Sequence, residues 1–318
     1  MKKIKLHYLD TGEWFSSYIN DLLKNDFEVE LDSKNPNFLF FTPFSKDHIY
    51  YDCVRIFYTG ENVRADFNFC DYAITFDYLD FGDRHIRFPL FLFEKNFHLL
   101  CDLSSTPPPH FLLKRDFCSF LVSNNKGAKI RTEAFRKFSE YKKVASGGKY
   151  LNNIGKNVKD KLSFISNYKF NIAFENSYTK GYVTEKLFES KMANSIPIYW
   201  GGLEKSDFSF LNKEAFINFD DYSNLDSMLD FVKYLDSNDD AYLSMLEKPL
   251  IIDKNYKPNQ NEKLKAFLFN IFNSKDPYRR GWGQWRINIE NRYKRYQKTR
   301  QIVNKIMQIL KFKWIRFK

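Results

Sequence analysis

Residues 170–187 read FNIAFENSYTKGYVTEKL. The apolar run at 170–174 is typical of a buried strand, and the polar run after it predicts a loop. Thr184 is a residue type that favours a helix start, so we predict a helix over 184–194. A strand, loop and helix in this order place polar side chains beyond the carboxyl end of a strand, where ligands of α/β sheets bind.

The same alternation extends over most of the chain. Before residue 105 we expect a helix over 14–23 and strands over 4–9, 27–31, 37–41, 54–58 and 72–76. After residue 116 we also expect strands over 117–122 and 196–200 and helices over 132–144 and 225–235. Several strand runs are apolar on both faces, as buried parallel strands are. The predicted fold class is therefore α/β, with two Rossmann-like, doubly wound domains facing each other across a cleft.

Three consecutive prolines, Pro107 to Pro109, separate the two series. Proline fits neither a helix interior nor a central strand, so we interpret this stretch as a linker between domains. The predicted organisation is an N-terminal domain over 1–105, a Pro-rich linker over 106–115, a C-terminal domain over 116–280 and a tail over 281–318.

The composition is that of a globular protein. Of the 318 residues, 43% are hydrophobic, enough for two ordinary cores. The four cysteines form no CxxC pair and the histidines have no ligand spacing, so we expect free thiols and no metal site. We see neither a signal-peptide pattern nor an apolar run of membrane-spanning length, and we expect a cytoplasmic protein.

The loop and the helix start predicted within residues 170–187 could bind an anion. Helix N-termini expose unpaired N–H groups, and Lys186 would add a positive charge beside a phosphate bound there. The alternative is that Glu185 and Lys186 are ordinary solvated residues of a helix start. The chain has no GxGxxG and no GxxxxGK[ST] motif, so hydride transfer and ATP hydrolysis lose their best support.

Three segments of this region together resemble a known signature. They are FNIAFENS at 170–177, GYVTEKL at 181–187 and IPIYWG at 196–201. They are similar to the donor-binding signature of α-1,3-fucosyltransferases of glycosyltransferase family 10, above all to bacterial members that make Lewis-type antigens. Gly181 stands where many members have Asp. The likeness extends, in the expected order, to FYTGEN at 57–62, DYAI at 71–74, FGDR at 81–84, LVSN at 121–124 and Ile130-Arg131.

The resemblance implies a GT-B fold whose C-terminal domain binds GDP-fucose. It implies transfer of fucose, with inversion, to a GlcNAc-containing acceptor of the N-acetyllactosamine type, as in lipopolysaccharide O-antigen or Lewis x synthesis. No cofactor would be obligatory, and a divalent cation would be at most stimulatory. Two alternatives stay open within this fold: a transferase for another nucleotide sugar, and a glycan-binding protein that does not catalyse transfer.

The resemblance also places the family's catalytic carboxylate at Glu61. This residue follows the strand predicted over 54–58, at the end expected to face the cleft. There it would take the proton from the acceptor hydroxyl as a general base. Without the resemblance, Glu61 would be interpreted as a surface carboxylate beside a glycine turn.

The same resemblance assigns five residues to the donor. Arg131 and Lys186 would stabilise the diphosphate of the leaving group, which a metal ion does in other enzymes. Glu185, counted with Glu61 as catalytic, would lie near the fucose and ribose and stabilise positive charge on the sugar. Asn176 and Tyr182 match donor-contacting positions. No metal-binding residues are expected.

The net charge of +11 is concentrated in the tail. From Arg292 onward there are ten Lys or Arg and no acidic residue, and without these the chain has 40 basic and 39 acidic residues. A nearly neutral body argues against nucleic-acid binding, which we keep as the weakest alternative.

The tail is predicted to form an amphipathic helix. Its apolar side holds Ile302, Val303, Ile306, Met307, Leu310, Trp314 and Phe317, and its polar side holds Asn304, Lys305, Gln308 and Lys311. Basic amphipathic helices bind anionic membrane surfaces. We therefore expect peripheral association with the inner membrane and a lipid-linked acceptor. The alternative is a terminal helix docked onto the protein body.

Overall fold

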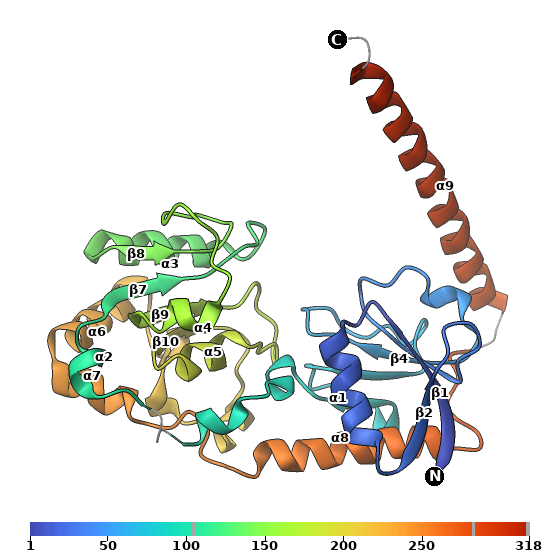
Figure 1. Ribbon diagram of the computed structural model, residues 1–318, viewed down its shortest axis with the longest axis horizontal. Coiled ribbons are helices and arrows are strands. Elements are labelled where there is room, and N and C mark those ends of the chain that lie inside the picture. The colour runs from blue at the N-terminus through green and yellow to red at the C-terminus, as the bar shows by residue number, and fades with distance from the viewer. Residues whose placement is uncertain (103–105, 282–283, 316–318) are drawn as a thin grey trace.

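The computed structural model describes residues 1–102, 106–281 and 284–315, and Figure 1 shows two α/β domains side by side. The N-terminal domain has a six-stranded sheet in the order β2-β1-β3-β4-β5-β6. The C-terminal domain has a five-stranded sheet in the order β11-β10-β9-β7-β8. Neighbouring strands run parallel in both sheets. The predicted fold of two parallel-sheet α/β domains is confirmed.

The elements have the following bounds. The strands are β1 (Lys2–Leu9), β2 (Phe27–Leu31), β3 (Phe38–Phe41), β4 (Val54–Tyr58), β5 (Tyr72–Thr75), β6 (His85–Arg87), β7 (Asp116–Phe120), β8 (Val144–Ser146), β9 (Tyr168–Phe174), β10 (Ile196–Trp200) and β11 (Ile217–Asn218). The helices are α1 (Glu13–Leu23), α2 (Pro109–Leu112), α3 (Lys129–Tyr141), α4 (Lys161–Ile165), α5 (Lys186–Met192), α6 (Leu225–Ser237), α7 (Asp239–Leu246), α8 (Tyr256–Asn273) and α9 (Gln284–Ile315).

The main core of the N-terminal domain lies on one face of its sheet. Val54, Ile56 and Tyr58 alternate along β4 and all join this core, as a period of two residues requires. Helices α1 and α8 cover the same face (Figure 1). Leu39 and Phe57 belong to a smaller cluster on the other face, which is packed by loop residues.

Helix α8 packs on the N-terminal domain, although it follows the C-terminal domain in the chain. Leu264, Phe267, Leu268, Ile271 and Phe272 are buried in the core of the first sheet. The sequence prediction assigned this segment, with the rest of 116–280, to the C-terminal domain. The apolar spacing of α8 fixes a buried helix face but does not say which sheet that face covers. The predicted boundary at residue 105 lies outside the described residues.

The C-terminal sheet is covered by helices on both sides. Helices α3, α6 and α7 share one core with β7, β9 and β10, and α5 packs on the other side. That second side continues into the core of the N-terminal domain, where Phe91 stacks on Phe188 with 4.2 Å between ring centroids. The two domains are therefore joined by apolar packing as well as by the chain.

Two predicted helices begin elsewhere. Helix α5 starts at Lys186 and not at Thr184, because the Thr184 hydroxyl is hydrogen-bonded to the Glu175 carboxylate and does not cap the helix. Helix α3 spans Lys129–Tyr141, and Val144 begins a short strand that pairs with β7.

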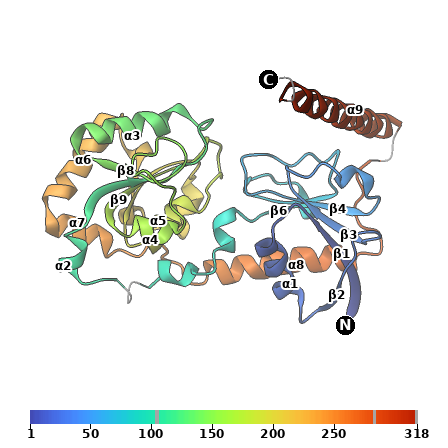
Figure 2. The same cartoon turned by 45° about the horizontal axis from the view of Figure 1, so that its top comes forward.

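The tail forms the long helix α9, which starts against the N-terminal domain and then extends away from it (Figures 1 and 2). Near its start, Glu290 pairs with the buried Arg55 at 2.8 Å. Farther along, several apolar side chains are about half exposed: Ile302, Val303, Ile306, Met307 and Leu310. Phe317 and the side chains of Lys311 and Trp314 lie outside the described residues. Across the described ranges, no helix is long and apolar enough to cross a membrane.

Candidate active site between the domains

Two loops meet at the junction of the domains, at the edges of the two sheets where the strands have their carboxyl ends. One follows β4 and carries Glu61 and Asn62, and the other follows β9 and runs to the start of α5. Asn62 Nδ2 donates to Ser177 Oγ at 2.7 Å, which joins the loops directly. Ligands of parallel sheets bind at this edge, so the two loops lie where a ligand site is favoured.

Glu175, directly after β9, organises the second loop. Its carboxylate is fully buried and accepts hydrogen bonds from the Thr184 backbone N–H at 2.7 Å and from the Thr184 hydroxyl at 2.7 and 2.9 Å. It also accepts one from Lys186 Nζ at 3.0 Å. Buried charge is tolerated only when paired and hydrogen-bonded, so Glu175 fixes the geometry of the loop. Sequence reasoning assigned it no role, although its place in the FEN motif was the available signal.

Lys186 is held by two carboxylates. Its ammonium has three N–H donors, and three acceptors lie within reach: Glu175 at 3.0 Å, the Thr184 hydroxyl at 2.8 Å and Glu185 at 3.4 Å. Burial disfavours the charged form, but Glu175 and Glu185 outweigh it and raise the pKa of Lys186. The sequence prediction treated Lys186 as an open cation for phosphate. In the structure, a phosphate could gain a hydrogen bond only by replacing one of these contacts.

Arg131 differs from Lys186 in the partners that its charged group contacts. It is buried in α3, and its Nη1 donates to Asn176 Oδ1 at 2.7 Å. No carboxylate among the described residues lies within ion-pair distance of it, and its Nε–H is buried without a hydrogen-bond partner there. A side chain at Gly127 would come within 2.1 Å of Nη1, so this glycine is needed for Arg131 to lie against Asn176. Arg131 is therefore the better candidate for a phosphate ligand.

Tyr182 lies in the segment between β9 and α5. It is buried, and its ring meets that of Phe76 edge-on at 5.1 Å across the domain boundary. Burial and the charges of Glu175, Glu61 and Glu185 together raise the pKa of its hydroxyl. The charges of Glu61 and Glu185 thus act on one side chain at the junction of the two domains.

Glu61 is exposed on its loop. Its backbone N–H donates to Thr59 Oγ1 at 2.9 Å, and this hydroxyl donates back to the Glu61 carbonyl at 3.0 Å. Within the described ranges its carboxylate forms neither a hydrogen bond nor an ion pair. The bonds with Thr59 hold the Glu61 backbone in place while its carboxylate stays exposed. A carboxylate held in this way can accept a proton from a bound hydroxyl.

Glu185 is the remaining residue predicted for the donor side. Its carboxylate lies 3.4 Å from Lys186 and 3.8 Å from Lys161. Burial opposes ionisation, but the two ammonium groups dominate and lower the pKa of Glu185, so it is ionised at neutral pH. Asn176, Tyr182, Glu185 and Lys186 thus all lie between the end of β9 and the start of α5, and Arg131 contacts Asn176 from α3.

Gly181 has a structural reason to be glycine. Its φ of +81° lies in the left-handed region, and a Cβ there would come within 2.8 Å of the Phe76 carbonyl oxygen. Its N–H donates to the Gly202 carbonyl at 2.7 Å. The loop can therefore pass close to the N-terminal domain at this point.

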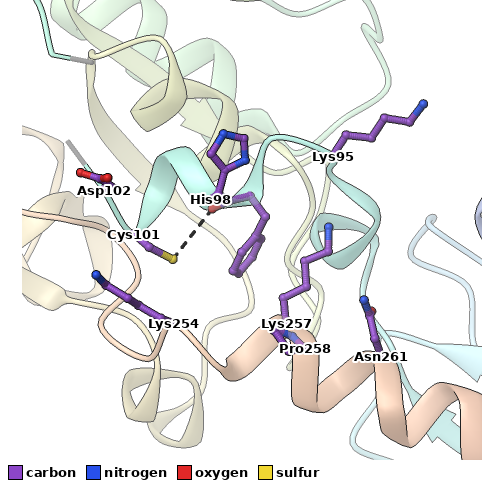
Figure 3. Close-up of a pocket in the computed structure, with 9 residues that line it drawn as sticks. Lys95, His98, Cys101, Asp102, Lys254, Lys257, Pro258 and Asn261 are labelled. Atoms are coloured by element: carbon purple, nitrogen blue, oxygen red, sulfur yellow. Dashed lines mark hydrogen bonds between the residues drawn. The ribbon is translucent and has the colours of Figure 1, made fainter. Parts of the chain in front are cut away.

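A cavity of about 400 Å³ lies beside this junction. Its lining comes from both domains: Arg64, Asp77, Tyr78 and Leu79 from the first, and Lys180, Glu204 and Ser206 from the second. Another, of about 440 Å³, lies where α8 begins, next to the turn at Phe97–Leu100 (Figure 3). None of the predicted site residues lines either cavity. The first is nevertheless lined from both domains, and Arg64 in its wall follows Glu61 closely in the chain, whereas at the second Lys257 donates to the Glu94 carbonyl. We therefore place the active site at the domain junction.

The described residues contain no group of His, Cys, Asp or Glu side chains that could hold a metal ion.

Two family models match the chain: the alpha-(1,3)-fucosyltransferase FucT N-terminal domain over residues 6–94, and the glycosyltransferase family 10 (fucosyltransferase) C-terminal domain over residues 112–266. The chain is 38% identical over 235 residues to the alpha-(1,3)-fucosyltransferase FucT of Helicobacter pylori, which covers 63% of this chain and 48% of that protein. It thus spans about half the length of this relative. It is 29% identical over 133 residues to human 4-galactosyl-N-acetylglucosaminide 3-alpha-L-fucosyltransferase 9, covering 41% of this chain and 36% of that one.

Solved structures agree with these matches. A crystal structure of an alpha1,3-fucosyltransferase superposes with a TM-score of 0.74 at 30% identity, over 89% of this chain and 93% of that one. The crystal structure of an alpha1,3-fucosyltransferase with GDP-fucose superposes with a TM-score of 0.71 at 30% identity, over 87% and 93% of the two chains.

Proposed function

The chain belongs to glycosyltransferase family 10, the fucosyltransferases, and from that premise we propose that it transfers fucose from GDP-fucose to a hydroxyl group of an acceptor glycan in α-1,3 linkage. The observation that carries the proposal is the hydrogen bond from Asn62, next to Glu61, to Ser177 on the loop that carries Tyr182 and Glu185, together with the bond from Arg131 to Asn176 on the same loop. It supplies a carboxylate for the acceptor side and a buried cation for the donor side.

The proposed reaction is an inverting single displacement. The acceptor oxygen forms a bond to the anomeric carbon of fucose while the bond from that carbon to the phosphate oxygen breaks, and GDP leaves from the opposite face. Glu61 takes the proton of the attacking hydroxyl. Arg131 stabilises the charge that develops on the diphosphate, and its freedom from a carboxylate partner leaves that charge available.

The remaining residues orient the donor. Glu185, ionised between two lysines, stabilises the positive charge that develops on the sugar ring. Asn176 holds Arg131 in place, and the buried Tyr182 packs against Phe76 and so positions the loop that carries Glu185. Lys186 acts mainly as a positioning residue, because its three donors already bind the loop. We propose that no divalent cation is obligatory, so EDTA should leave most of the activity.

We propose an acceptor of the N-acetyllactosamine type, carried on a lipid, with the tail bound to the anionic inner membrane surface. The support is the row of half-exposed apolar side chains on α9 together with the absence of acidic residues after Arg292. A chain truncated after Arg300 should keep transfer to soluble acceptors and lose binding to anionic liposomes. Equal binding of both chains to liposomes would refute the membrane role.

The proposed activity is tested with the purified full chain, GDP-fucose and N-acetyllactosamine. We expect a fucosylated product whose linkage and anomeric configuration are read by NMR. Parallel reactions with other nucleotide sugars test the alternative donor. A glycan-binding protein without catalysis would release no GDP, with or without acceptor, and that result would refute the proposal.

A further inference from the structure

A small apolar cavity lies in the N-terminal domain, where β3 and β4 end. Its volume is about 240 Å³, and aromatic rings form much of its wall: Phe41 and Phe57 from the ends of the two strands, Phe69 from a loop and Tyr293 from α9. Arg64 and Asp66 add charged groups to the lining. The carboxyl edge of a parallel sheet is where ligands bind, so this cavity occupies a favoured position.

The cavity adjoins the candidate base. Val63 and Arg64 line it, and they follow Glu61 closely along the same loop. The Val63 N–H donates to the Glu61 carbonyl at 2.7 Å, so Glu61 and the lining residue Val63 belong to the same tight turn. Arg64 also lines the cavity between the domains and pairs with Asp77 at 3.0 Å. A molecule bound here would therefore lie beside the turn that carries Glu61.

Tyr293 reaches this cavity because the start of α9 is anchored by buried charges. Arg55 is buried in β4, and its Nη1 donates to Glu290 at 2.8 Å. Asp71, fully buried, accepts from the Arg55 backbone N–H at 2.7 Å and from Arg280 at 2.7 Å. These bonds hold Arg280 and Glu290 against β4 and the residue that precedes β5. The Tyr293 ring then lies 6.2 Å from that of Phe69.

We infer that this cavity binds one sugar ring of the acceptor glycan and that Tyr293 is an acceptor-selecting residue supplied by the tail helix. The inference rests on the proposed function. Aromatic rings pack against the C–H faces of a pyranose, while Arg64 and Asp66 can hydrogen-bond its hydroxyls. The volume is below the roughly 300–1,000 Å³ of sites for drug-sized ligands, so it suits a single ring. The first turns of α9 thus belong to the active site, apart from any role of its exposed end.

The test compares two tyrosines of the same helix. Tyr293 lines the cavity, whereas Tyr296, one turn on, is 60% exposed and is the matched control. Tyr293→Ala should raise the KM for N-acetyllactosamine about five- to tenfold, the loss expected for one aromatic contact. Its Kd for GDP-fucose and its rate of GDP-fucose hydrolysis without acceptor should stay at the wild-type values. Tyr296→Ala should match the wild type throughout, and Tyr293→Phe should stay close to it.

A wild-type KM for the acceptor in Tyr293→Ala would overturn the inference. A rise in the Kd for GDP-fucose equal to the rise in acceptor KM would also overturn it, because the effect would then be structural. If Tyr293→Ala does not fold by thermal melting, Tyr293→Leu replaces it and should still raise the KM. A wild-type chain that transfers no fucose would instead refute the proposed function, and acceptor binding by NMR titration would then decide the assignment of the cavity.

Discussion

Lys186→Met removes the ammonium that pairs with the buried Glu175 and keeps most of the side-chain length. Glu175 would lose a 3.0 Å partner while keeping its bonds from the Thr184 N–H and hydroxyl. Removing one member of a buried ion pair costs about 3–5 kcal/mol, because the other charge stays buried. Since Thr184 remains bound to Glu175, we expect a loss near the lower end, about 3 kcal/mol in the free energy of unfolding.

The assay is urea unfolding of four chains: wild type, Lys186→Met, Glu175→Gln and the double variant. The double variant should recover much of the loss, because no unpaired charge is left. Lys180→Met is the matched control, since Lys180 is exposed and pairs with Glu204 only at 3.6 Å, so it should change stability by less than about 1 kcal/mol. If Lys186→Met unfolds like the wild type but binds GDP-fucose much more weakly, Lys186 is a direct phosphate ligand and our interpretation is wrong.

Two further predictions concern other charges of the site. Arg131→Ala should lower kcat/KM at least about 100-fold, on the order of 3 kcal/mol of transition-state stabilisation, and weaken GDP binding in calorimetry; near-normal transfer would move the diphosphate site elsewhere. Glu189 lies in α5, one turn after Glu185, and pairs with Lys161 at 3.3 Å. Burial and the charge of Glu185 outweigh Lys161 and raise the pKa of Glu189 to about 7, so the folded chain holds a proton that the unfolded chain releases. The wild type should therefore be stabilised by this group at pH 5 and lose about 2–3 kcal/mol as the pH rises to 8, whereas Glu189→Gln should not lose it; urea unfolding with the same pH dependence in both chains would contradict this.

The sequence was sufficient for most of the strands, although β6, β8 and β11 were not predicted, and for the order of strand, loop and helix start within residues 170–187. The apolar run of β9 and the polar residues after it are local features, and they predicted where Asn176, Tyr182 and Glu185 lie. The separation into two α/β series followed from the prolines at 107–109 in the same way. Local patterns of this kind survive folding because they reflect the burial of each strand.

Other features depended on contacts between distant segments. The apolar face of α8 was not enough to show that it returns to the first sheet. The pairing of Lys186 with Glu175 depends on how the loop folds back, which spacing along the chain does not determine. The same holds for Tyr293, whose place at the cavity is set by the distant Arg55. The ion pairs between separate segments, and the packing of α8 on the first sheet, could therefore be learned only from the structure.

The central claim is tested most directly by Glu61→Gln. Glutamine keeps the shape and a hydrogen-bonding oxygen but cannot take the proton, so only the transition state should suffer. Loss of a general base predicts a fall in transfer rate of at least about 100-fold, with the Kd for GDP-fucose close to that of the wild type. Calorimetry with GDP-fucose and the initial rate of transfer to N-acetyllactosamine measure the two quantities. Transfer by Glu61→Gln at a rate near that of the wild type would contradict the account and place the base elsewhere.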